Sequence, residues 1–290
     1  MRIASNKLID IIHFFYSELI ALYTKDEIEV FIKYCLEDFA GILPHHLNSQ
    51  KTITVSESEL LKLNTAVKDL KKQKPIQYIL GNAHFYGLKF QVDERVLIPR
   101  PETEELVDLI LKDHPLIDSK LNVIDIGTGS GCIPISIKKN KSDWTLSALD
   151  ISSDALGVAS KNAVINHVAI NFVQADILNE KIIAHFNTKF DIIISNPPYI
   201  KISEKVDMFA NVLEYEPHLA LFVDNDDPLL FYKAILKFAK KMLHPTGKVY
   251  FEINEALGPE TMELMLTYGF KNVELIKDIN NKNRILRGVY

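Results

Sequence analysis

The sequence lacks the features that mark secreted, zinc-binding or membrane-spanning proteins. Its 290 residues include only two cysteines, Cys35 and Cys132, and neither belongs to a Cys-x-x-Cys pair. This argues against a disulfide framework and a cysteine-based zinc site, and it fits a reducing compartment. No apolar run approaches the roughly 18 residues of a membrane span. Residues 1–13 contain neither the uninterrupted apolar stretch nor the cleavage site of a secretion signal. We therefore expect a cytoplasmic protein that needs no metal ion and contacts no membrane.

An excess of positive charge is also missing, since 33 Lys and Arg residues stand against 38 Asp and Glu residues. The formal net charge of -5 is unlike that of proteins that grip long stretches of nucleic acid through clustered Lys and Arg. The clearest basic run, residues 68–74, is more simply the solvated end of a helix, where the helix dipole favours cations. We expect no direct sequence-specific binding of nucleic acid.

Residues 1–75 carry apolar side chains at helical spacing, in three successive segments. Thr24 is the expected N-cap of the second helix because Glu27 follows three residues later, as in a capping box. Ser56 or Ser58 is expected to open the third helix. We therefore predict a small N-terminal helical bundle over residues 1–75, which by its position would dock the substrate.

After this bundle the pattern changes from helical spacing to short apolar runs. Residues 76–97 are aromatic, punctuated by glycine and partly alternating, which predicts a connecting β-hairpin that turns near Gly87. Residues 98–290 contain seven short apolar runs, namely 121–126, 144–150, 170–174, 190–195, 247–253, 272–277 and 284–289. Helix-like stretches separate the first five, which is typical of a doubly wound, mostly parallel sheet, and the last two fit an antiparallel hairpin at its edge. The predicted fold is therefore α/β, with a Rossmann-like, seven-stranded domain preceded by the helical bundle.

A glycine-rich loop directly after the first of these runs is the strongest single feature of the sequence. It consists of Gly127, Thr128, Gly129, Ser130 and Gly131. Glycine permits a tight turn and lets a ligand approach the backbone closely at the carboxyl end of a strand, where open α/β sheets bind ligands. The spacing Gly-x-Gly-x-Gly differs from the Gly-x-Gly-x-x-Gly fingerprint of dinucleotide-binding proteins, and no Gly-Lys-Ser/Thr follows. Asp125, just before the loop, suits a ligand with a cationic ammonium group better than a pyrophosphate, so a nicotinamide oxidoreductase is the least favoured enzyme class.

Two further carboxylates follow strands of the predicted sheet. Asp150 ends the second run and can accept hydrogen bonds from both ribose hydroxyls of a nucleoside, unless it is only a helix N-cap or a solvated strand end. Asp176 follows the third run and can accept from an adenine amino group while Ile177 covers the ring, unless it only forms an Asx turn. Together with the loop and Asp125, these residues predict a site for a nucleoside that carries a cationic group.

The fourth run ends abruptly in Asn196, Pro197, Pro198 and Tyr199, because two prolines cannot continue a parallel ladder. The stiff turn can point the Asn196 side-chain oxygen and the Pro197 carbonyl into one pocket, where two acceptors suit an NH2 group. An amide or aniline-like nitrogen is a poor nucleophile, so holding it in line with an incoming methyl group would supply much of the rate, while Tyr199 stacks on the flat substrate. In isolation this tetrapeptide is only a strong turn. After the fourth strand of a sheet whose first strand ends in the glycine loop, it predicts a catalytic site for methyl transfer to nitrogen.

From about residue 75 to the C-terminus, the sequence resembles the release-factor glutamine methyltransferases of the HemK/PrmC type. The matching blocks are residues 77–81, 85–87, 97–104, 125–131, 196–200, 215–217, 220–221 and 251–253. The Asn-Pro-Pro-Tyr motif is shared with adenine-N6 methyltransferases, whereas the Pro-Arg-Pro-Glu-Thr-Glu block at 99–104 is much more particular to this family. The resemblance implies a class I methyltransferase domain over residues 98–290 that acts as an S-adenosylmethionine-dependent protein-(glutamine-N5) methyltransferase.

The resemblance also implies the reactants. The methyl donor would be S-adenosyl-L-methionine, and the acceptor would be the side-chain nitrogen of the glutamine in the Gly-Gly-Gln motif of peptide-chain release factors. The residues that match the family's donor site are 127–131, Asp150, Ile177 and Asn196. Those that match its glutamine site are Asn196, Pro197, Pro198 and Tyr199. Arg100 and Glu102 belong to the signature block and are expected near the substrate. We expect a monomer whose partners are release factors.

Two other functions stay open at this point. An adenine-N6 methyltransferase acting on DNA or RNA would use the same pocket chemistry, but it would need a basic face and a route for a flipped base. A non-catalytic nucleotide-binding module would keep the glycine loop, although the intact Asn-Pro-Pro-Tyr motif argues against it. For transfer to an amide we predict no general base, because the amide proton becomes acidic only once methylation has begun.

Overall fold

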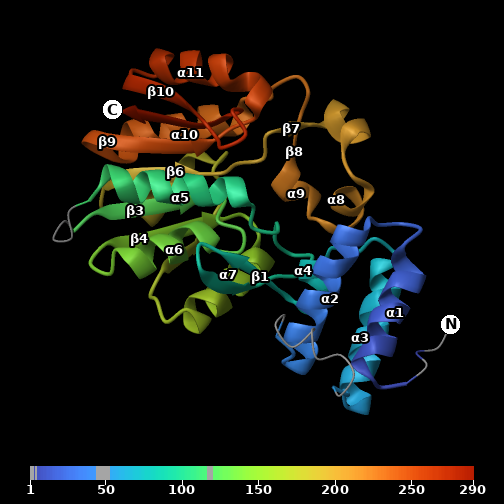
Figure 1. The fold of residues 1–290 in the computed structure, drawn as a ribbon. Helices are drawn as coiled ribbons and strands as arrows, with labels where there is room; N and C mark the ends of the chain where they lie inside the picture. Colours follow the sequence, from blue (N-terminus) through green and yellow to red (C-terminus); the bar gives the residue numbers. More distant parts are fainter. Residues whose placement is uncertain (1–2, 4, 44–52, 116–119) are drawn as a thin grey trace. The chain divides into compact units, whose positions relative to one another are not determined.

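The computed structural model describes residues 3, 5–43, 53–115 and 120–290 (Figure 1). Packing divides the chain into two compact units. The first comprises Met1–Gly81 and Ala210–Tyr215, and the second comprises Asn82–Phe209 and Glu216–Tyr290. These units follow from packing alone, and the functional borders expected at residues 75 and 97 stay predictions.

The first unit is helical. Its helices are α1 (Leu8–Leu19), α2 (Lys25–Ala40), α3 (Glu57–Leu70), α4 (Ile76–Leu80) and α8 (Ala210–Tyr215). Thr24 and Ser56 form capping boxes with Glu27 and Glu59 at the starts of α2 and α3, which confirms the helix start predicted at Thr24. Helix α2 ends at Gly41, whose φ of 64° is a left-handed conformation that glycine adopts without strain. The apolar faces of α1, α2 and α3 meet in one hydrophobic core.

A short β-hairpin opens the second unit. Strands β1 (Asn82–Phe85) and β2 (Leu88–Gln91) pair antiparallel around a two-residue turn. Both turn residues, Tyr86 and Gly87, have positive φ, of 49° and 73°, which matches the twist of a tight hairpin. The turn thus lies where the glycine pattern indicated, whereas residues 76–80 form α4 and not part of a strand.

The second unit is built on a seven-stranded sheet, which confirms the predicted α/β fold. Its strands are β3 (Asn122–Ile126), β4 (Thr145–Asp150), β5 (Asn171–Gln174), β6 (Phe190–Ser195), β9 (Leu243–Glu252), β10 (Lys271–Lys277) and β11 (Asn283–Val289). They lie in the order β10-β11-β9-β6-β3-β4-β5. Strand β11 runs antiparallel to both of its neighbours, and the remaining pairs are parallel.

Helices cover both faces of this sheet (Figure 1). They are α5 (Pro101–Asp113), α6 (Cys132–Asn140), α7 (Ser153–Ile165), α10 (Leu230–Met242) and α11 (Gly258–Thr267). One core joins α5, α6 and α7 to one face through residues such as Ile110 and Ile194, and the other joins α10 and α11 to the opposite face through Leu236 and Phe251. No helix in the described ranges is long and apolar enough to cross a membrane.

The strand order places a ligand site at the centre of the sheet. From β3 the chain moves outward through β4 and β5, then returns to β6 on the other side of β3. Open α/β sheets bind ligands at such a reversal, beyond the carboxyl ends of the strands. The smaller elements that follow are η2 (Glu180–His185), β7 (Ile200–Lys201), η3 (Ile202–Asp207), α9 (His218–Leu221), β8 (Phe222–Val223) and η4 (Glu255–Leu257).

Candidate functional site

A cavity of about 250 Å³ lies at the carboxyl ends of the central strands. Among the residues singled out in the sequence, it is lined by Arg100, 127–130, Asp150, 176–177 and 196–198. The glycine loop after β3 and the Asn-Pro-Pro turn after β6 therefore share one cavity, as the interpretation of the motifs required. The selected residues that do not line it are Glu102, Asp125, Gly131 and Tyr199.

The glycine loop depends on backbone conformations that other residues adopt only with strain. Gly127, Gly129 and Gly131 have φ values of 77°, 53° and 79°. A Cβ on Gly131 would also come within 3.1 Å of the Cβ of Ala159 in α7, so this glycine allows α6 and α7 to pack closely. The loop is therefore shaped by its sequence. Hydrogen bonds inside the protein hold it, since the N–H groups of Gly127 and Thr128 both donate to the Leu149 carbonyl, at 2.8 and 3.0 Å.

Asp150 ties the loop to the end of β4. One carboxylate oxygen accepts from the Gly129 N–H at 2.8 Å, and the other accepts from the Ser152 N–H at 3.0 Å. Ser152, and not Asp150, is the N-cap of α7. Burial raises the pKa of Asp150, and these backbone hydrogen bonds oppose the rise because they favour the carboxylate. Each oxygen keeps further acceptor capacity for a hydroxyl in the cavity.

Asp125 lies beneath the loop rather than in the cavity wall. It is fully buried, and neither carboxylate oxygen has a hydrogen-bond partner among the described residues. Burial raises its pKa to about 7, and the nearby Asp150 adds to the rise. The neighbouring Thr128 hydroxyl, which is also buried, opposes the rise in this pKa. A buried carboxylate with little compensation favours its protonated form, unless a cation lies close to it.

Asp176 and Glu102 are the remaining acidic residues singled out in the sequence, and they have different surroundings. Asp176 accepts from the Leu178 N–H at 2.9 Å, as in an Asx turn, and it also lines the cavity beside Ile177. Glu102 is half-buried in the first turn of α5, and its charge adds to the rise in the pKa of the buried Glu252.

The Asn-Pro-Pro-Tyr turn is held by groups from distant parts of the chain. The Asn196 Nδ2 donates to Thr103 Oγ1 at 3.3 Å, and Thr103 Oγ1 donates to Glu252 Oε2 at 2.6 Å. The Tyr199 hydroxyl donates to Glu252 Oε1 at 3.1 Å, and Asn254 donates to the Tyr199 carbonyl at 3.2 Å. The Tyr199 ring packs against the core on the α10 side. In this arrangement Tyr199 anchors the turn and does not face the cavity.

Arg100 is the one basic residue of the signature block at the cavity. Its guanidinium donates to Glu216 Oε1 at 2.5 Å, and the second Glu216 oxygen accepts from the Ile98 N–H at 3.3 Å. Glu216 is only 4% exposed, so Arg100 compensates a buried charge. The Arg100 guanidinium is thereby held at the cavity wall.

Four residues that form hydrogen bonds around the site had no role assigned from the sequence: Thr103, Asn162, Glu216 and Glu252. The Asn162 amide donates to the carbonyls of Ser130 and Gln91, both at 2.9 Å, and so links the glycine loop to the hairpin. A signal was present for Thr103, which lies one turn before Leu106 on the apolar face of α5, and for Glu252, which interrupts an apolar run. A polar residue at such a position indicates a buried hydrogen bond.

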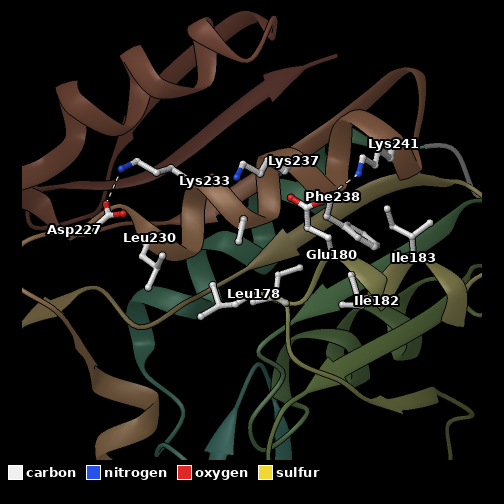
Figure 2. A pocket seen from close by; sticks show the side chains of 12 residues that line it. Leu178, Glu180, Ile182, Ile183, Asp227, Leu230, Lys233, Lys237, Phe238 and Lys241 are labelled. Carbon is white, nitrogen blue, oxygen red and sulfur yellow. Dashed lines mark hydrogen bonds and ion pairs between the residues drawn. The ribbon is translucent and has the colours of Figure 1, made fainter.

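A second cavity of about 250 Å³ lies between α10 and η2 (Figure 2). Figure 2 shows Lys233, Lys237 and Lys241 along one side of α10, above apolar side chains such as Leu178. Lys233 is paired with Asp227 at 2.7 Å. The cavity shares Ile177 and Leu178 with the first one but contains neither the glycine loop nor the Asn-Pro-Pro turn. We therefore place the candidate active site in the first cavity.

Comparisons with known proteins show what this chain is similar to. Residues 103–216 match the family model described as "Methyltransferase small domain". The chain is 47% identical over 275 residues to the release factor glutamine methyltransferase of Flavobacterium psychrophilum, covering 94% of this chain and 95% of that protein. It is 43% identical to the protein of the same name from Bacteroides thetaiotaomicron, covering 91% of this chain and 94% of that protein. A methyltransferase from Pyrococcus furiosus shares the fold, with a TM-score of 0.51 and 20% identity over 70% of this chain and 89% of that one.

Proposed function

The chain belongs to the family of release factor glutamine methyltransferases, S-adenosylmethionine-dependent protein-(glutamine-N5) methyltransferases, and on this premise we propose that its acceptor is the glutamine of the Gly-Gly-Gln motif in peptide-chain release factors. The observation that carries the proposal is the cavity shared by residues 127–130 and 196–198. A donor held by the first segment and an amide held by the second would meet there.

The residues present fit S-adenosylmethionine, which supplies a methyl group on a sulfonium when it is bound. Asp150 would accept from the ribose hydroxyls, and Asp176 with Ile177 would hold the adenine. Asp125, a buried carboxylate just before the glycine loop, would supply the negative charge that faces the cationic amino group of the ligand.

The acceptor amide would be held by two oxygens, the Asn196 Oδ1 and the Pro197 carbonyl. Both would accept from the NH2 group of glutamine and keep its nitrogen in line with the methyl carbon. As the amide nitrogen forms its bond to the methyl carbon, the bond from that carbon to sulfur would break and S-adenosyl-L-homocysteine would be the leaving group. The nitrogen would gain positive charge, and its proton would become acidic. That proton leaves to these acceptors or to water, so no side chain has to act as a general base.

The cellular location that we propose for the enzyme follows from the proposed substrate. The enzyme would act as a monomer in the cytoplasm, where release factors work, and would bind no nucleic acid by sequence. Both cysteines are buried and free, which is compatible with a reducing compartment.

The decisive experiment uses purified protein, isotopically labelled S-adenosylmethionine and a purified release factor. We expect one labelled methyl group, mapped by mass spectrometry to the glutamine of the Gly-Gly-Gln motif. A release factor with that glutamine replaced by alanine is the matched control and should gain no label. An unmethylated oligonucleotide tests adenine-N6 transfer in parallel. Label on the oligonucleotide, or on a different residue of the release factor, would overturn the proposal.

A further inference from the structure

A chain of hydrogen bonds runs from the candidate active site to a buried carboxylate. It begins at the Asn196 Nδ2, passes through Thr103 Oγ1 and ends at Glu252 Oε2. The other oxygen of Glu252 accepts from the Tyr199 hydroxyl. One carboxylate therefore binds both ends of the four-residue turn, Asn196 through Thr103 and Tyr199 directly.

The donors and acceptors in this chain determine the orientation of the Asn196 amide. The Thr103 and Tyr199 hydroxyls both donate to the Glu252 carboxylate, so both hydroxyl protons point toward Glu252. The Thr103 oxygen then has only lone pairs left for Asn196. It can face the NH2 edge of the amide and not the oxygen edge. The Asn196 Oδ1 must therefore lie on the other side of the amide, available to the cavity that Asn196 lines.

This orientation of the Asn196 amide matters because the two ends of an asparagine amide have nearly the same shape. Packing alone distinguishes them poorly, and a hydrogen-bond network has to decide between them. A flipped Asn196 would present its own NH2 group to the NH2 group of a glutamine substrate. Two donors would then face each other, and one of the two acceptors in the proposed mechanism would be lost.

The carboxylate that sets this orientation is itself held firmly. Glu252 is 1% exposed and Thr103 is 3% exposed, so water does not compete for their bonds. The Tyr232 hydroxyl donates to the Glu252 carbonyl at 3.0 Å, which fixes the backbone at the end of β9. Burial raises the pKa of Glu252, and the hydrogen bonds from Thr103 and Tyr199 and the charge of Arg284 oppose this rise because they favour the carboxylate. A buried ion that is bonded in this way orders its neighbours, because breaking any single bond leaves a charge or a donor unsatisfied.

We propose that Thr103 and Glu252 are positioning residues that orient the Asn196 amide with its Oδ1 toward the substrate. The proposal rests on the proposed function, because it assumes that the acceptor brings an NH2 group to Asn196. Neither residue transfers a group or a proton. Their effect is to keep one acceptor in place before the substrate arrives.

The test compares Thr103→Val with Thr103→Ser. Valine keeps the shape of threonine but removes the hydroxyl, whereas serine keeps the hydroxyl and loses only a methyl group. We expect kcat for release-factor methylation to fall about 10- to 100-fold in Thr103→Val and to stay within about threefold of wild type in Thr103→Ser. The Kd of S-adenosylmethionine should stay within about twofold in both variants, because the defect concerns orientation and not binding. Glu252→Gln, which keeps the shape but places a donor opposite one hydroxyl, should lose kcat as Thr103→Val does.

A second measurement follows the exchange of the Asn196 side-chain NH2 protons with water, in the absence of substrate. In protein labelled with 15N-asparagine, the side-chain signal of Asn196 is assigned by its loss in Asn196→Ser. Its NH2 protons should exchange slowly with water in wild type and Thr103→Ser, and faster in Thr103→Val. If wild type shows this protection but methylates no release factor, the proposed function fails and the positioning role stands. Wild-type kcat or unchanged exchange in Thr103→Val would overturn the positioning role, as would an equal loss of kcat in Thr103→Ser.

Discussion

The Asp150 carboxylate accepts a hydrogen bond from the Gly129 N–H at 2.8 Å, so the residue expected to bind ribose also holds the glycine loop. The two roles are compatible because each carboxylate oxygen can accept more than one hydrogen bond. A substitution at Asp150 should therefore affect the donor site both directly and through the loop.

Asp150→Asn should weaken S-adenosylmethionine binding by about 10- to 100-fold, because an amide NH2 replaces one acceptor and two charge-assisted hydrogen bonds are lost or weakened. Isothermal titration calorimetry measures this directly. Asp154→Asn, at an exposed aspartate in the first turn of α7, is the matched control and should bind the donor normally. Equal affinities of Asp150→Asn and wild type would remove Asp150 from the donor site.

Asn196→Ala should lower kcat on the order of 100-fold, because the acceptor amide loses one of the two oxygens that align it. Donor affinity should change much less, since other residues of the cavity hold the donor. Single-turnover methylation of a release factor, combined with donor titration, separates the two quantities. Asn140→Ala, at an exposed position on α6, should keep full activity. Normal turnover in Asn196→Ala would refute the role assigned to this side chain.

Gly131→Ala should destabilise the fold by about 1–3 kcal/mol, since it forces an alanine into the left-handed region and crowds a buried contact. The φ of Gly131 is 79°, and a Cβ there would lie 3.0 Å from Ile135 Cδ1 and 3.1 Å from Ala159 Cβ. Gly157→Ala is the control, because a Cβ at this position of α7 meets nothing within 4 Å. It should be neutral or stabilising by up to about 1 kcal/mol. Urea unfolding of both variants measures the difference.

The buried Asp125 predicts a specific dependence of stability on pH. Its pKa is about 7 in the folded protein, against 3.8 for an unperturbed aspartate, so the folded chain holds a proton that the unfolded chain releases. The stability contribution of the protonated form is complete below pH 3.8 and is lost as the pH rises to about 7. The free energy of unfolding of Asp125→Asn minus that of wild type should therefore increase over this interval and level off above it. A constant difference between pH 4 and pH 8 would show that Asp125 is not buried as a protonated acid.

Local patterns in the sequence were sufficient to predict most of the fold. The capping box at Thr24, the seven apolar runs and the positive φ of the loop glycines depend on residues close together in the chain. The Gly-x-Gly-x-Gly loop and the Asn-Pro-Pro turn also carry their local geometry in their own residues. Their meeting in one cavity followed from a general rule, because the carboxyl ends of neighbouring parallel strands lie at the same edge of a sheet.

The tertiary structure alone decided which polar groups meet in the interior. Thr103 and Glu252 are 149 residues apart, and they share a hydrogen bond because the fold brings the first turn of α5 to the end of β9. Tyr199 could be read from the sequence as a stacking aromatic, yet its hydroxyl is directed to the same carboxylate. The periodicity of apolar residues indicates which face of a helix or strand is buried, but it does not indicate which buried hydrogen-bond donor pairs with which acceptor. That choice depends on strand order and packing, which no local pattern contains.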